Sequence, residues 1–157
     1  MEERRSPFTH ILVPTDGSET SIHAGRLAIQ IAAASRARIT LVYVVTEDTA
    51  IVGKIAAAAS KTLEATRREL EQTGQRYLDY LSRLAREQNV PVEGIIRRGV
   101  PHNEIATLAR ERKVDLIVIG RVGSHGPRSA RIGPVAERVI EYAPCPVLVV
   151  SQSIPHV

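Results

Sequence analysis

The residues best suited to chemistry form a glycine-rich loop, GRVGSHGPRSARIGPVAERV, at positions 120–139. Successive backbone N–H groups in such a loop can form an anion-binding concavity, and glycine lets the backbone approach a ligand closely. The loop leads into a helical pattern whose first N–H groups and dipole favour negative charge. Arg128 and Arg131 could add charge-assisted hydrogen bonds. A connecting loop whose glycines only permit tight turns is the alternative, and the residues alone leave both interpretations open.

A second polar turn, PTDGSE at positions 14–19, follows a short apolar run. Its carboxylate, Asp16, could accept hydrogen bonds from ligand hydroxyls. The same carboxylate could instead cap a helix, because Asp16 and Glu19 have the spacing of a capping box. Ser18 is a rival cap. The turn therefore has a binding and a structural interpretation.

Several other chemistries lack their signatures. The sequence contains neither G-x-x-x-x-G-K-[ST] nor G-x-G-x-x-G, so a Walker-type site and a dinucleotide fingerprint are not matched. Cys145 is the single cysteine, with no histidine arrangement that suggests a nucleophile, and no carboxylate pair stands out for acid–base work. The histidines have no metal-ligand spacing, and no metal ligands are predicted; they are His10, His23, His102, His125 and His156.

The elements that must position the two loops alternate along the chain. Apolar runs predict strands at 9–15, 38–45, 91–99, 114–120 and 144–151. Apolar residues at helical spacing predict helices at 18–35, 101–113 and 135–142, and a long one between Leu63 and Ala85 that Gly74 weakens locally. An Ala-rich stretch at 50–60 offers few anchoring side chains and is the segment expected to move most.

Continuous apolar strands of this kind are buried on both faces, which requires a parallel sheet covered by helices. The predicted fold class is therefore α/β: a three-layer sandwich with a five-stranded parallel sheet in the order 3-2-1-4-5. One domain spans residues 1–157, with its core at about 8–151. Ligands bind such sheets where the winding direction reverses, here between the first and fourth strands, and both polar turns leave the sheet there.

Composition narrows the class of partner. Of 157 residues only 3% are aromatic, too few for the stacking platforms of single-stranded nucleic-acid binders. The net charge is +4, and because the arginines alternate with glutamates along the chain, they indicate a solvated surface of mixed charge rather than a basic stripe. We therefore expect no nucleic-acid partner. No apolar run approaches membrane-spanning length, and the first one is too short for a signal peptide. With one cysteine and no internal disulfide, a cytoplasmic location is expected.

Taken together, these motifs resemble the universal stress protein family. Gly120, Gly123 and Gly133 reproduce its G-x2-G-x9-G spacing, and ILVPTDGSE resembles its first strand and Asp-bearing turn. LVYVV is similar to its second strand, RRGVPHNEIATLARERKVDLIVIG to its third-helix region, and GPVAERVIEYAPCPVLVV to its C-terminal signature. The resemblance covers roughly residues 8–151 and implies a fold like that of the adenine nucleotide alpha hydrolases.

The resemblance also implies an adenine nucleotide, ATP, ADP or AMP, as the ligand, with Mg²⁺ able to accompany it. By position, Val44 would meet the adenine through its backbone, and Asp16 would accept hydrogen bonds from hydroxyl groups. Slow ATP hydrolysis stays open, because Asp16 could help to hold a metal near the phosphates. No residue is identified that would position the attacking water, so a binding role is favoured over catalysis. The implied nucleotide-binding residues are Pro14, Thr15, Asp16, Val44, Gly120, Arg121, Val122, Gly123, Arg131, Gly133, Pro134 and Val135.

Pro134 departs from the family pattern, because nucleotide-binding members usually carry Ser or Thr directly after the last glycine. Proline removes a hydroxyl and a backbone N–H, two donors that would face phosphate. At roughly 1.5–3 kcal/mol per charge-assisted bond, the loss could weaken binding by about two to four powers of ten. The helix itself is unaffected, since proline suits its first position. We therefore expect a nucleotide pocket with a weakened phosphate end, which either binds adenine nucleotides modestly or holds AMP rather than ATP.

The last strand, PVLVV at 146–150, is apolar and lies at an edge of the predicted sheet. Antiparallel pairing with its symmetry mate would give a homodimer, which the resemblance also implies. Two alternatives to a nucleotide-responsive stress or signalling module stay open. One is a nucleotide-independent dimeric interaction module in the stress response; the other is a nucleotidyl-transferring or flavin-binding relative of the same architecture.

Overall fold

The computed structural model describes residues 6–122 and 131–151, in which strands and helices alternate. The strands are β1 (His10–Pro14), β2 (Arg38–Thr46), β3 (Val92–Gly99), β4 (Leu116–Gly120) and β5 (Val147–Val150). The helices are α1 (Glu19–Ser35), α2 (Thr49–Ala58), α3 (Leu63–Glu87), α4 (Pro101–Glu111) and α5 (Pro134–Tyr142). The predicted alternation of elements is confirmed.

All five strands run parallel in one sheet, in the order β3-β2-β1-β4-β5. Val13 pairs with Leu41 across β1 and β2, and Leu12 pairs with Ile117 across β1 and β4. The predicted fold class and strand order are confirmed, and the winding direction reverses between β1 and β4.

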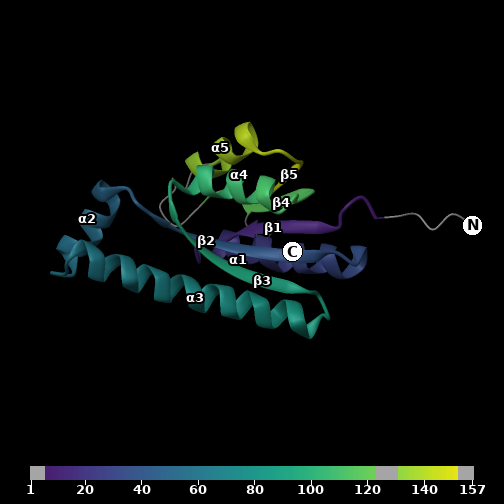
Figure 1. Cartoon of the computed structure of the whole chain (residues 1–157), viewed down its shortest axis with the longest axis horizontal. Helices are drawn as coiled ribbons and strands as arrows, with labels where there is room; N and C mark the ends of the chain where they lie inside the picture. The colour runs from purple at the N-terminus through teal and green to yellow at the C-terminus, as the bar shows by residue number, and fades with distance from the viewer. Residues whose placement is uncertain (1–5, 123–130, 152–157) are drawn as a thin grey trace, which may run out of the picture.

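The sheet separates two aliphatic cores, and Figure 1 shows the resulting three layers. Because side chains alternate along a strand, Ile11 and Val13 pack in the core shared with α1 and α3, whereas Leu12 packs in the core on the α4 and α5 side. The helices contribute Leu78 and Leu81 to the first core and Leu108 and Val139 to the second; all of these residues are buried.

Most differences from the predicted elements lie at their ends. Helix α4 stops at Glu111 because Lys113 adopts a left-handed conformation with φ 50°, which breaks the helical run before β4 begins at Leu116. Strand β5 starts only at Val147, because Pro144 and Pro146 have no N–H to donate to a neighbouring strand. The carbonyl of Pro146 still accepts a 3.0 Å hydrogen bond from the Ile117 N–H.

The Ala-rich stretch forms helix α2, which lies beyond the carboxyl ends of the strands beside the start of α3 (Figure 1). Asp48 caps this helix by accepting a 2.9 Å hydrogen bond from the Ala50 N–H. Val52 and Ala56 are buried, so this segment has packed side chains despite its composition. Helix α3 runs without a break through Gly74.

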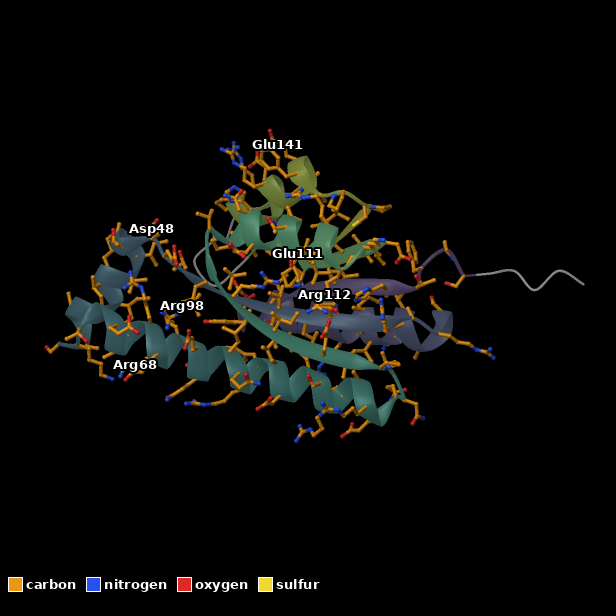
Figure 2. All side chains as sticks on the ribbon, in the orientation of Figure 1. Asp48, Arg68, Arg98, Glu111, Arg112 and Glu141 are labelled. Carbon is orange, nitrogen blue, oxygen red and sulfur yellow. The ribbon has the colours of Figure 1, made fainter. Side chains whose placement is uncertain are left out.

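Arg98 links the edge strand β3 to α3. Its Nε lies 2.5 Å from Glu71 Oε1, and one guanidinium nitrogen lies 3.7 Å from Glu64 Oε1. Figure 2 shows this side chain between the two elements. No helix in the described ranges is both long and apolar enough to span a bilayer.

Candidate functional site

A pocket of about 690 Å³ opens at the carboxyl ends of β1, β2 and β4, where the winding direction of the sheet reverses. This volume falls within the range of small-molecule sites. Both polar turns contribute to its wall. The lining residues from β1 and the turn after it are Pro14, Thr15 and Asp16; those from the β4 and α5 region are Ile119, Gly120, Arg121, Val122, Gly133, Pro134, Val135 and Ala136.

The turn after β1 is fixed by hydrogen bonds. The Thr15 N–H donates to the Val42 carbonyl at 2.9 Å, and Thr15 Oγ1 lies 3.1 Å from Ser21 Oγ. Ser18 is the N-cap of α1, since its Oγ accepts a 3.2 Å hydrogen bond from the Ser21 N–H. The interpretation of Asp16 as the helix cap is therefore wrong. Asp16 Oδ1 instead accepts from the Ser18 N–H at 2.9 Å, which orients an exposed carboxylate at the pocket wall.

Gly17 allows this turn to pack closely on α3. Its φ is 80°, which non-glycine residues rarely adopt, and a Cβ placed there would lie 2.0 Å from the Tyr77 ring. The centroid of the Tyr77 ring lies 6.4 Å from that of the Tyr43 ring. Tyr43 is one of the residues that line the pocket. Burial, followed by the negative charge of Asp16, raises the pKa of Tyr43 above its ordinary value.

The two ends of the glycine loop are held together through Arg121. Its N–H donates to the Val150 carbonyl at 2.8 Å, and its carbonyl accepts a 2.7 Å hydrogen bond from the Gly133 N–H. Its guanidinium donates to the Arg131 carbonyl at 3.0 Å. Gly120 packs against α1, where a Cβ would meet Ser21 and Thr20 atoms at 3.1 Å. Close packing therefore explains this glycine independently of any ligand.

Helix α5 begins at the pocket with its N-terminus towards the cavity. Gly133 is the N-cap and Pro134 the first helical residue, and no side chain caps the helix. Val135 and Ala136 follow at the second and third positions and both line the pocket. Their N–H groups belong to the helix N-terminus, where the dipole favours negative charge. Pro134 offers no N–H, and that of Gly133 is already used within the loop.

The opposite end of the pocket is apolar. Its walls come from three helices, with Ile51 and Ile55 on α2, Leu70 on α3, and Val100, Pro101 and Ile105 at the start of α4. Sequence reasoning missed these residues. A signal was present, because Ile51 and Ile55 are the large aliphatic residues at i,i+4 spacing within the Ala-rich stretch.

Ten of the twelve residues that the resemblance implies for nucleotide binding line this pocket. Arg131 does not line it: its side chain is exposed, and the residue meets the loop through its carbonyl. Gly123 lies outside the described residues, as do Arg128 and His125. The ten are Pro14, Thr15, Asp16, Val44, Gly120, Arg121, Val122, Gly133, Pro134 and Val135.

The described ranges contain no group of three His, Cys, Asp or Glu side chains placed to hold a metal ion. Cys145 is half-buried, and burial, followed by the negative charge of Asp115, raises the pKa of its thiol. A raised pKa disfavours the thiolate, so this cysteine is a poor nucleophile at neutral pH.

Comparison with known proteins agrees with this architecture. The model of the universal stress protein family matches residues 7–151. Universal stress protein MJ0531 of Methanocaldococcus jannaschii is 39% identical over 145 residues, covering 92% of this chain and 83% of that protein. The MJ0577 structure, from the same organism, superimposes with a TM-score of 0.79 at 25% identity, covering 94% of this chain and 99% of its own.

A universal stress protein solved in complex with cAMP is also similar, with a TM-score of 0.66 and 26% identity over 93% of this chain and 98% of that one. The family match spans the whole described core, from before β1 to the residue after β5. The chain therefore belongs to the universal stress protein family.

Proposed function

We propose that this protein is a nucleotide-responsive stress module that binds adenine nucleotides in the pocket at the carboxyl end of the sheet, and that it favours AMP over ATP. The observation that carries the proposal is the polarity of this pocket. Because β1 lies between β4 and β2 in the sheet, the exposed carboxylate of Asp16 after β1 lies between the uncapped N-terminus of α5 and the apolar compartment beyond β2. A similar chain of the family was solved with cAMP, a nucleotide with one phosphate.

The polarity orients the ligand. Phosphate belongs at the start of α5, where the N–H groups of Val135 and Ala136 and the charge of Arg121 favour an anion. The base belongs at the apolar end, against Val44 and Ile105. Asp16 lies between these regions, where a carboxylate can accept hydrogen bonds from the ribose hydroxyls.

Discrimination between AMP and ATP follows from the donors at the phosphate end. Pro134 supplies neither a hydroxyl nor an N–H, and the Gly133 N–H donates to the Arg121 carbonyl. A single phosphate can be met by the two remaining helix N–H groups. The additional phosphates of ATP have fewer hydrogen-bond donors to bind to. Each charge-assisted hydrogen bond that is not made costs roughly 1.5–3 kcal/mol of binding free energy. Any Mg²⁺ would be held mainly by the phosphates, because Mg²⁺ binds through one or two carboxylates and substrate phosphates.

Isothermal titration calorimetry with AMP, ADP and ATP tests the proposal. We expect AMP to bind, and ATP to bind no more tightly than AMP. The matched variant is Asp16→Asn, which retains an oxygen to accept from the Ser18 N–H but removes the negative charge. It should weaken AMP by about tenfold or more, the size of a hydrogen bond to a charged group. Absence of binding by all three nucleotides at millimolar concentration would overturn the proposal.

The edges of the sheet support a second function, homodimerisation through β5. Edge strand β3 carries Glu93, Arg97 and Arg98, charges of the kind that protect an edge from pairing. Edge strand β5 has the sequence VLVV, and Leu148 is 38% exposed. Antiparallel pairing of two β5 strands would form an isologous two-fold interface. If the protein is instead the nucleotide-independent interaction module, this dimer would carry its role in the stress response without a bound nucleotide.

A further inference from the structure

The apolar end of the pocket includes a wall that an adenine base against Val44 and Ile105 would leave uncovered. Ile51 and Ile55 lie four residues apart on α2 and line the pocket with Leu70 of α3. Val52 and Ala56, which anchor α2 to the rest of the protein, are buried. Ile51 remains 38% exposed, although isoleucine is usually among the most buried residues. The α2 helix therefore presents a separate aliphatic face to the cavity.

The two cores show that this wall reaches beyond the compartment for the base, because Leu70 packs with the core on the α3 side of the sheet. Val44 packs with the core on the α4 side, whereas Tyr43 and Val45 belong to the core on the α3 side. All three residues line the same pocket. The cavity therefore extends around the carboxyl end of β2. A flat base stacked on Val44 and Ile105 leaves the α2 wall uncovered.

The charges around this second compartment define what it can accept. The charged residues between the end of β2 and the start of α2 are the acidic Glu47 and Asp48, and both line the pocket. Among the described lining residues, Arg121 is the one cation, and it lies at the phosphate end. Arg98, on the neighbouring strand, is paired with Glu71 and Glu64. A second phosphate or a carboxylate would meet repulsion, so an uncharged aliphatic or aromatic group is favoured.

We propose that the pocket takes adenine nucleotides that carry an apolar substituent on the base, at the exocyclic amino edge, with the substituent covering Ile51, Ile55 and Leu70. This inference rests on the proposed nucleotide function. With the phosphate at α5 after β4 and the ribose at Asp16 after β1, the base extends past Val44 of β2, the strand that α2 follows. The exocyclic amino group lies on the pyrimidine ring, away from the glycosidic bond, and therefore on the part of the base that points onward towards α2. It adds a ligand class, N6-alkyl or N6-aryl adenosine monophosphates, to the binding of AMP itself.

Calorimetry with AMP and N6-benzyl-AMP tests the inference on the full chain. We expect N6-benzyl-AMP to bind at least tenfold more tightly than AMP, since burial of apolar surface is favourable in proportion to its area. In Ile55→Ala, which shortens the wall but keeps a strong helix former, this ratio should fall below about threefold. Leu63→Ala is the matched control, because Leu63 is an exposed aliphatic residue of α3 that does not line the pocket.

The outcomes separate the inference from the function on which it rests. If AMP binds but N6-benzyl-AMP binds no more tightly, the inference is overturned and the nucleotide function stands. If the tenfold ratio persists in Ile55→Ala, the substituent lies elsewhere and the inference is overturned. If neither compound binds, both proposals are wrong. A ratio that is lost in Ile55→Ala and kept in Leu63→Ala supports the inference.

Discussion

Gly74 of α3 faces the ring of Tyr43 of β2 so closely that a Cβ at Gly74 would lie 2.2 Å from Tyr43 Cδ1. Both residues are buried. The absence of a side chain lets the helix rest on the ring, which in turn lines the pocket. Leu70 lies one turn earlier on the same helix and also lines the pocket. This contact therefore couples the packing of α3 to the shape of the candidate site.

Gly74→Ala should destabilise the protein even though alanine is the better helix former. The added methyl group would clash with a buried ring, and overpacking of a core costs about 1–3 kcal/mol. The gain in helix propensity offsets about 0.5–1 kcal/mol of this. We expect a net loss of about 1–2 kcal/mol in the free energy of unfolding, measured by urea denaturation.

Gly53→Ala provides the control for helix propensity. Gly53 lies within α2, and a Cβ there would meet nothing within 4 Å. This substitution should therefore be neutral or stabilising by up to about 1 kcal/mol. If Gly74→Ala behaves like Gly53→Ala, the close contact with Tyr43 does not limit the packing of α3.

His10 should make the stability of the protein depend on pH. The ring is buried, its Nδ1 donates to the Arg112 carbonyl at 3.1 Å, and its Nε2 lies 2.7 Å from Thr40 Oγ1. In a neutral ring with its proton on Nδ1, Nε2 accepts from the Thr40 hydroxyl, which then cannot donate its one hydrogen to Glu93 Oε1, 3.2 Å away. Burial, followed by the positive charge of Arg38, lowers the pKa of His10 below its ordinary value.

A lowered pKa in the folded state means that the unfolded chain binds the proton more readily. The contribution of His10 is therefore complete above its unfolded pKa of about 6.5 and is lost as the pH falls from there through the lower folded value. Glu93 and Asp115 act in the opposite direction but do not reverse the shift. Urea denaturation between about pH 8 and 5 should show this loss in the wild type and a flatter curve in His10→Gln. Parallel curves would contradict the assignment.

Much of the fold could be predicted because its signals are local and repeated. The apolar runs around Ile11, Leu41 and Ile117 were long enough to require strands buried on both faces, and a parallel sheet followed from that. The order of the strands then placed Asp16 and Gly133 at one crevice. The cap of α1 could not be decided in advance, because Asp16 and Ser18 both have suitable side chains and only the backbone geometry selects Ser18.

The missed features depend on contacts between residues far apart in the sequence. Gly74 suggests a weak point in a helix when α3 is considered alone, and its role appears only with Tyr43 on the neighbouring strand. Likewise, an Ala-rich composition suggests a poorly anchored segment. The buried Val52 and the pocket-facing Ile55 become visible only once α2 is placed beside α3 and the sheet edge.

Pro134→Ser should restore binding of the triphosphate. Pro134 is the exposed first residue of α5, so serine can replace it without disturbing a core. The substitution returns a hydroxyl and an N–H at the phosphate end, and we expect ATP to gain at least about 100-fold in affinity, measured by calorimetry. Pro134→Ala returns only the N–H and should give a smaller gain, about tenfold or more. Unchanged ATP affinity in both variants would show that position 134 does not limit phosphate binding.

Leu148→Lys should convert the proposed dimer into a monomer. Leu148 is exposed on the free edge strand β5, and a lysine there would place like charges close together across the two-fold axis. Size-exclusion chromatography with light scattering at micromolar concentration should give twice the chain mass for the wild type and the chain mass for the variant. Leu63→Lys adds the same charge at a similarly exposed leucine on α3 and should remain dimeric. A wild type that is monomeric would remove the β5 interface, and a Leu148→Lys dimer would place the interface on another surface.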